Sequence, residues 1–296
     1  MNRKSTSWGI LNLVLTFFLW GSVYVAGKLG STELPPFQIT ALRCTLAMPV
    51  LLLMARKHLR MPIRREDHKL FLAVGLLGYY LTFELVQLGV SLTGASVAAL
   101  VNSFNPVAIM LLAALFLRER ITPTKLLCLA LAMAGTLIVA GGAHGQGELL
   151  GILSTLLATL TWGTAAVCIR KLTARYPAIL VTTCGMALSL LLHIPTGIID
   201  ALRQPPRISA TGAATVLYLA LAGTALAQLT WAKALTQFPA GTCSLFYPLQ
   251  AVFSALLGAV VLHETFTSAF FIGLAFVAAD VALSTWETSR EAKQAA

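Results

Sequence analysis

The sequence contains very little charge. Asp, Glu, Lys and Arg make up only 11% of its 296 residues, whereas soluble domains average about 25%. Hydrophobic residues account for 57%, and the mean hydropathy is +0.82. So few polar groups cannot cover so large an apolar surface in water. A soluble domain is therefore excluded, and lipid is the expected solvent.

Sequence motifs for common chemistries are also missing. There is no glycine-rich nucleotide loop, no Ser/His/Asp set and no HExxH, and His144, His193 and His263 are isolated. We therefore expect neither an enzyme nor an ATP-driven pump, and no metal or cofactor. The five cysteines lie in apolar stretches without metal-like spacing, so we interpret them as small core residues: Cys44, Cys128, Cys168, Cys184 and Cys243.

The sequence does contain many long apolar runs. Each approaches the roughly 20 residues that span a bilayer as a helix. Their apolarity is continuous rather than alternating, which predicts helices and not a barrel. The ten runs are 9–29, 35–55, 70–90, 94–117, 123–143, 149–169, 177–199, 212–235, 240–262 and 268–286.

The two halves of the chain repeat one another. Residues 9–21 read GILNLVLTFFLWG and residues 151–163 read GILSTLLATLTWG, identical at six of thirteen positions. Further along, the offset becomes 145. We expect one repeat at 1–145 and a second at 146–296. Because each has five spans, an odd number, the second must enter the membrane from the opposite side. The predicted fold is an all-α polytopic membrane protein of two inverted five-helix repeats.

The basic residues are distributed unevenly along this topology. With the N-terminus inside, seventeen of the 21 Lys and Arg residues fall in cytoplasmic segments and three in outer ones, while Arg43 lies within a span. This is a positive-inside distribution, which predicts an inner-membrane protein with both termini in the cytoplasm. We therefore attribute the net charge of +10 to the basic cytoplasmic segments that orient the protein in the membrane. No nucleic-acid partner is expected.

The chain resembles the EamA family of the drug/metabolite transporter superfamily over essentially its whole length. The resemblance rests on the five-plus-five layout, the Trp-Gly pairs at 20–21 and 162–163, and the helix-end pattern Leu-x-Glu-x-x-Thr at 117–122 and 262–267. Asn105-Pro106 matches the family's fourth-helix proline, whereas the second half has Pro248 three residues before the aligned position. Size and layout are similar to YddG-type amino-acid exporters. The resemblance implies metabolite export through a central cavity.

Polar residues within spans are functional candidates because they are costly in lipid. Tyr80, Phe83, Glu84 and Gln87 share one face of the third helix, with Tyr79 beside them. The eighth helix, which is the repeat mate of the third, carries Gln228 at the position equivalent to Phe83, and Trp231 on the same face. On the fourth helix, Asn102 and Asn105 match Tyr247 and Gln250. These residues could line a shared cavity. Alternatively, they could only hold helices together by hydrogen bonds.

Two charged residues admit several interpretations. Glu84 could bind a substrate ammonium group, couple transport to protons, or pair with a buried donor. Arg43 lies about 10 Å into the second helix. It could bind a substrate carboxylate, extend toward the interface, or form a structural pair.

Aromatic residues and prolines complete the candidate site. Trp20 and Trp162 are repeat mates in the middle of their spans, and with the other aromatics they could form a pathway wall, although each could equally be packing. Pro106 and Pro248 are candidate helix kinks. Glu119 and Glu264 lie beside turns and are interpreted as structural.

The sequence therefore predicts a secondary transporter that exports small organic metabolites by alternating access, amino acids and especially aromatic or hydrophobic ones. The expected partners are a small-molecule substrate and membrane lipid, and the working expectation is a monomer. One alternative is a proton-coupled exporter of drugs or cationic amphiphiles. Another, of a different class, is a membrane enzyme that modifies lipids, which would need a catalytic set that the sequence does not contain.

Overall fold

The computed structural model describes residues 3–117, 146–206, 208–238 and 246–276, together with 123–124, 126–127, 130–131, 134–135, 138, 240, 243, 278–279 and 282–283. All regular elements in these parts are helical, which confirms the all-α prediction. Six helices are long and apolar enough to cross a membrane among the described residues. Most of the fifth predicted stretch, 123–143, lies outside them, as does the end of the tenth.

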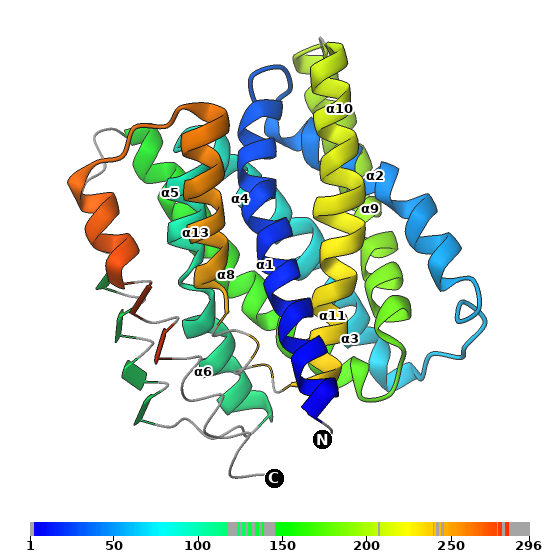
Figure 1. Ribbon diagram of the computed structural model, residues 1–296. Coiled ribbons are helices and arrows are strands. Elements are labelled where there is room, and N and C mark those ends of the chain that lie inside the picture. Colours follow the sequence, from blue (N-terminus) through cyan, green and yellow to red (C-terminus); the bar gives the residue numbers. More distant parts are fainter. Residues whose placement is uncertain are drawn as a thin grey trace.

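The helices form one bundle (Figure 1). The first half contains α1 (Arg3–Gly30), α2 (Pro36–Ala55), α3 (His68–Ala73), η2 (Val74–Leu81), α4 (Thr82–Leu92), α5 (Ala95–Asn102) and α6 (Asn105–Leu117), with a short turn η1 (Arg65–Asp67) before α3. The second half contains α8 (Gln146–Thr173), α9 (Ala178–Arg203), α10 (Ala210–Tyr218), η3 (Leu219–Leu226), α11 (Ala227–Gln237), α13 (Pro248–Leu257) and η4 (Gly258–Leu262). Residues 268–276 are also helical.

Contacts between loops define two ends of the bundle. At one end, which we call the Tyr176 end, the Tyr176 hydroxyl donates to Asp67 Oδ2 over 2.7 Å, and Arg175 Nη1 lies 2.9 Å from Asp67 Oδ1. At the other, the Glu264 end, Glu33 accepts hydrogen bonds from the backbone and hydroxyl of Ser209. These bonds to Ser209 lower the pKa of the exposed Glu33 carboxyl.

The two repeats run in opposite directions between these ends. α1 starts near Phe238, at the Tyr176 end, and finishes where Lys28 donates to the carbonyl of Ser91. α8 starts beside Leu92, at the Glu264 end, and finishes next to Tyr176. Equivalent helices are therefore antiparallel, and the predicted inversion of the repeats is confirmed.

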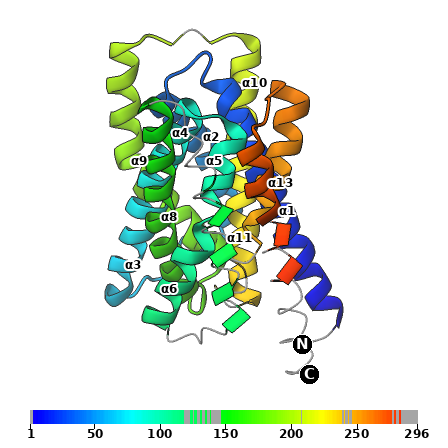
Figure 2. The same ribbon diagram turned by 90° about the vertical axis from the view of Figure 1, so that its left-hand side faces the viewer.

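Each half packs against the matching helices of the other. α1 lies against α11 and α13, while its mate α8 lies against α4 and α6, and α2 lies against α9. Figures 1 and 2 show this packing of one half against the other from two directions. The helices in the middle of the bundle consequently form the interface between the two halves. In transporters built from inverted repeats, the substrate site is expected at this interface.

The third and eighth spans share an uncommon backbone feature. η2 and η3 are wider π-helical segments of eight residues each, and they coincide at the repeat offset of 145. Each carries a glycine that permits close packing on the other half. A Cβ on Gly78 would lie 2.6 Å from Ala165 Cβ, and one on Gly223 would lie 2.4 Å from Val23 Cγ2. π-helical turns often occur at functional sites.

The fourth span is broken rather than kinked at Pro106. α5 ends at Asn102 and α6 begins at Asn105, with a turn between them. Pro106 has no N–H to bond the carbonyl four residues earlier, that of Asn102. The Asn105 side chain replaces this donor, with Nδ2 3.0 Å from that oxygen. Pro106 is the second residue of α6 and Pro248 is the first residue of α13, so both prolines lie at the start of a helix and do not bend one.

Glu264 has the structural role that its position beside a turn indicates. Its carboxylate, from the second half, accepts hydrogen bonds from the N–H groups of Ala95 and Ser96 and from the Ser96 hydroxyl at the start of α5. It thereby caps a helix of the first half. The equivalent Glu119 lies outside the described residues.

Replacing Glu264 by alanine is expected to lower the free energy of unfolding by about 1–3 kcal/mol, because it strips two backbone donors of α5 of their partner. Glu264→Gln keeps an acceptor oxygen and should lose less. The midpoints of unfolding in denaturing detergent measure both. Equal midpoints for the wild type and Glu264→Ala would contradict the capping role.

Candidate functional site

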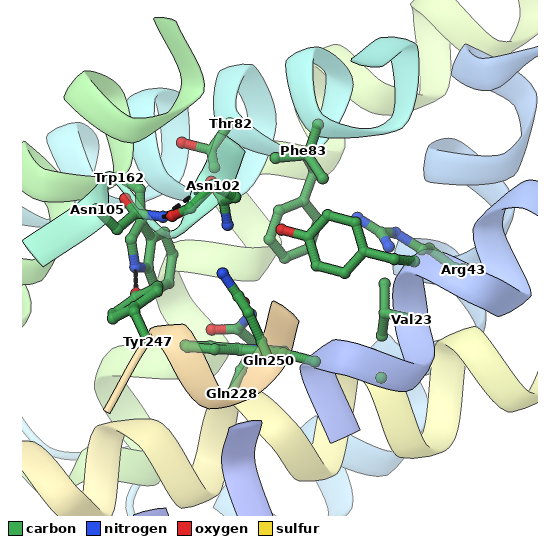
Figure 3. Close-up of a pocket in the computed structure, with 14 residues that line it drawn as sticks. Val23, Arg43, Thr82, Phe83, Asn102, Asn105, Trp162, Gln228, Tyr247 and Gln250 are labelled. Carbon is green, nitrogen blue, oxygen red and sulfur yellow. Dashed lines mark hydrogen bonds between the residues drawn. The ribbon is translucent and has the colours of Figure 1, made fainter. Parts of the chain in front are cut away.

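A cavity of about 60 Å³ lies between the two halves in the middle of the bundle. Helices of both repeats contribute to its wall, and Figure 3 shows Arg43 and Phe83 on one side with Trp162 and Tyr247 on the other. The space admits only a few water molecules, so a metabolite needs the halves to move apart. The lining residues are Trp20, Val23, Tyr24, Arg43, Thr82, Phe83, Val86, Asn102, Asn105, Trp162, Gly223, Gln228, Tyr247 and Gln250.

An aromatic cluster, which we call the floor, lies at one side of this cavity: Trp20, Trp162 and Tyr247 line the cavity, and Phe17 and Trp231 pack behind them. The Trp20 and Trp162 rings, from equivalent positions, meet edge to face at 5.7 Å between centroids, and Trp20 and Trp231 lie 5.3 Å apart. The Trp162 indole N–H donates to the Tyr247 hydroxyl. All five side chains are buried.

The order of residues along the helices shows toward which end of the bundle the aromatic cluster lies. On α1, which runs toward the Glu264 end, Trp20 precedes the wall residues Val23 and Tyr24. In the eighth span, which runs the other way, Trp231 follows Gly223 and Gln228. Both helices place the aromatic cluster on the Tyr176 side of the cavity. The cluster therefore lies between the cavity and the Tyr176 end.

The wall carries buried polar atoms that have no hydrogen-bond partner among the described residues. Two are donors, Arg43 Nε and Gln250 Nε2, and two are acceptors, Asn105 Oδ1 and Gln228 Oε1. A buried polar atom without a partner costs about 1–3 kcal/mol. Four of them around one cavity indicate a site that a polar ligand or water completes.

Arg43 provides the only cationic side chain among the lining residues. It is 4% exposed, and its guanidinium carbon lies 4.4 Å from the centroid of the Phe83 ring. This stacking holds the planar group against the wall and supplies cation–π stabilisation. The side chain is buried instead of reaching the surface, and it forms no ion pair among the described residues, so it is available to an anion.

The fourth span contributes a fixed amide pair. Asn105 Nδ2 donates to both the carbonyl and the Oδ1 of Asn102, over 3.0 and 2.8 Å. These bonds use the amino group of Asn105 and leave its Oδ1 as the unpaired acceptor at the cavity. The break at Pro106 thus also sets the orientation of a cavity residue.

Five predicted site residues do not line this cavity. Glu84 bonds with His193 and Thr40, and Gln87 Nε2 donates to the carbonyl of Gly27 and the hydroxyl of Ser31. Three aromatic residues also point elsewhere: Tyr79 packs on Gly185, Tyr80 lies beside His193, and Trp231 belongs to the floor cluster behind the lining. His193, which has no metal-like spacing to other ligands in the sequence, is brought against Glu84 by the fold.

Sequence reasoning also missed lining residues. Val23 and Tyr24 follow Trp20 by three and four positions, and Val86 follows Phe83 by three, so helical spacing could have identified them. Thr82 gave no comparable signal, because it is a common residue in membrane helices. Gly223 lines the cavity through its backbone and the absence of a side chain.

Two inverted repeats of membrane-spanning helices around a polar, aromatic-lined cavity are typical of a membrane transporter. The model of the EamA-like transporter family matches the chain twice, at residues 7–141 and 149–286. The chain therefore belongs to the EamA-like transporter family, which confirms the resemblance seen in the sequence and makes the protein a multi-pass membrane transporter.

Individual relatives agree with this assignment. An "uncharacterized transporter" of Archaeoglobus fulgidus is 26% identical over 272 residues, which cover 88% of this chain and 91% of the relative. A "probable amino-acid metabolite efflux pump" of Escherichia coli is 27% identical over 300 residues, covering 94% and 93%. A solved crystal structure with 22% identity superposes with a TM-score of 0.73 over 96% of this chain and 98% of its own, which supports the fold.

Proposed function

We propose that the protein is a secondary carrier that exports small organic metabolites, specifically amino acids with aromatic or apolar side chains, by alternating access across the inner membrane. The observation that supports this most is the set of unpaired atoms around the cavity. Arg43 Nε and Gln250 Nε2 are donors suited to a carboxylate, and Asn105 Oδ1 and Gln228 Oε1 are acceptors suited to an ammonium group. A zwitterion needs both kinds.

The apolar part of the wall suits the side chain of such a substrate. Trp20, Phe83, Trp162 and Tyr247 offer aromatic surface beside the polar atoms. Aromatic walls with a few polar groups recognise amphiphilic molecules. A buried cation at Arg43 repels cationic amphiphiles. The cavity therefore supports an amino-acid exporter over the alternative of a drug exporter.

The proposed direction and orientation rest on charge distribution. Ten of the described basic residues lie at or near the Tyr176 end of the bundle, which supports a cytoplasmic location for this end under the positive-inside rule. They are Arg56, Lys57, Arg60, Arg64, Arg65, Lys69, Arg170, Lys171, Arg175 and Lys233. The aromatic floor then lies between the cavity and the cytoplasm, and export requires a state in which this side opens. We also propose that the chain divides into repeats at 1–145 and 146–296.

Counterflow with purified protein in liposomes tests the proposed substrate class. Vesicles loaded with one unlabelled amino acid should accumulate the same labelled amino acid, with aromatic and apolar ones ahead of charged ones. Lipophilic cations serve as the competing class. Accumulation of cations alone would replace the proposal with the drug-exporter alternative, and failure of every amino acid would refute it.

A further inference from the structure

A buried carboxylate–imidazole pair lies outside the cavity lining. Glu84 on α4 and His193 on α9 meet with Oε1 and Nδ1 2.7 Å apart. His193 is fully buried and Glu84 is 4% exposed. α4 belongs to the first repeat and α9 to the second, so this contact joins the two halves directly. A stabilising role alone is a weak explanation, since apolar side chains often replace buried ion pairs without loss of stability.

Hydrogen-bond geometry fixes where one proton must be. His193 Nε2 lies 3.0 Å from the backbone oxygen of Tyr79. A carbonyl oxygen only accepts, so Nε2 carries a hydrogen. At 2.7 Å, Nδ1 and Oε1 then need a second hydrogen between them, either on the imidazole or on the carboxyl. Without it, a nitrogen lone pair faces a carboxylate oxygen and the contact is repulsive.

Thr40 lets the same site accept a further proton. Its hydroxyl oxygen lies 2.6 Å from Glu84 Oε2 and 3.0 Å from the carbonyl of Phe37. When Glu84 is ionised, the hydroxyl donates to Oε2. When Oε2 is protonated, the carboxyl donates to Thr40 and the hydroxyl turns to the Phe37 carbonyl. Two protonation states are therefore satisfied with the heavy atoms in one place.

Other ionisable groups surround the pair on the neighbouring helices. On α2, Arg43 interacts electrostatically with Glu84, and Cys44 contacts His193. From η2, the Tyr80 ring lies 5.0 Å from the imidazole, and its hydroxyl side faces Thr196 of α9. Arg43 is the member that also lines the cavity. Arg43 therefore lies between the Glu84–His193 pair and the proposed substrate site.

We propose that Glu84 and His193 form the proton site of this carrier and exchange a proton during the transport cycle. The proposal rests on the carrier function above. The exchanged proton is the one between Nδ1 and Oε1: loading forms an N–H bond at Nδ1 or an O–H bond at Oε1 with a proton taken from water, and unloading breaks that bond and returns the proton to water. Loss of the proton between Nδ1 and Oε1 breaks the α4–α9 contact. Because these helices belong to opposite halves, protonation is tied to the relative position of the halves.

Spectroscopy of the purified protein tests the proton site without a substrate. Nitrogen NMR of labelled histidine follows His193, identified by the signal lost in His193→Gln, and infrared difference spectra follow the Glu84 carboxyl. We expect both groups to change over one pH interval, and the His193 change to move or vanish in Glu84→Gln. His68→Gln, at an exposed histidine, is the control and should leave both signals unchanged. Independent titration of the two groups, or no titration while the protein stays folded, would overturn the proposal.

Transport measurements test whether the site is coupled to movement. In Glu84→Gln and His193→Gln, accumulation of an amino acid driven by an imposed pH gradient should be lost, while counterflow without a gradient persists. A gradient response that survives in both variants would refute the coupling. If the wild type transports no amino acid, the proposed function fails, whereas the spectroscopic result still decides the proton site. Both glutamine variants keep hydrogen-bonding capacity, and folding is checked by size-exclusion chromatography.

Discussion

Replacing Gly21 by leucine is expected to prevent the protein from folding. A Cβ at this position would lie 2.8 Å from the backbone oxygen of Gln250 and 2.8 Å from Phe253 Cβ, both on α13. The backbone of a packed helix cannot rotate away as a flexible side chain can. Even one methyl group should cost about 1–3 kcal/mol of overpacking, against a gain of about 1 kcal/mol in helix propensity. Leucine adds three more carbons at the same contact.

The repeat mate Gly163 supplies a matched comparison. Its Cβ would lie 3.1 Å from Ala108 Cβ, 3.1 Å from Leu112 Cδ1 and 3.2 Å from the Ala108 carbonyl carbon, a smaller overlap than the two 2.8 Å contacts at Gly21. Gly163→Ala should therefore be less damaging than Gly21→Ala. The yield of monodisperse protein and the midpoint of unfolding in detergent measure the series. A folded Gly21→Leu variant with the wild-type midpoint would show that α1 and α13 do not depend on this contact.

These glycines also explain why a Trp-Gly pair is repeated. Adjacent helical residues point about 100° apart, so Trp20 can face the cavity while Gly21 faces α13. In the second half Trp162 faces the cavity and Gly163 faces α6. The sequence repeat thus encodes an aromatic wall and a close helix contact at once. Repetition and apolar length were sufficient to predict the fold, because each depends only on the order of residues along the chain.

The candidate site could be predicted only in part. Repeat mates such as Asn105 and Gln250, or Trp20 and Trp162, do meet at one cavity, since the inverted halves bring equivalent positions together. Glu84 shares a helical face with Phe83 but turns to His193, 109 residues away in the chain. No periodicity reports such a contact, because it depends on how α9 of the other half is placed. The partner of a buried charge therefore had to come from the structure.

The break at Pro106 shows a similar limit. The proline predicts a disturbed helix, but whether the chain bends or restarts depends on what binds the freed carbonyl of Asn102. Here the Asn105 side chain does so, and the helix restarts. The same bond leaves Asn105 Oδ1 free to face the cavity. The same Asn105 side chain therefore satisfies the backbone at the helix break and supplies a polar atom to the cavity.

Neutralising Arg43 should selectively weaken recognition of the substrate carboxylate. A hydrogen bond to a charged group is worth about 1.5–3 kcal/mol, so Arg43→Gln should raise the KM for a transported amino acid by about 10- to 100-fold. Arg43→Lys keeps the charge but loses the planar group that stacks on Phe83 and its Nε donor, and an intermediate KM is expected. Counterflow at varied substrate concentration measures all three proteins.

The decarboxylated amine of the same substrate separates recognition from general damage. It lacks the group that Arg43 would bind and carries a cation that Arg43 repels, so the wild type should transport it poorly and Arg43→Gln should transport it better. Folding should persist, because removing a buried charge also removes its desolvation cost. An equal loss of transport for the amino acid and the amine would show that Arg43 supports the structure and does not bind the carboxylate. Opposite changes for the two compounds are the result that only a carboxylate site explains.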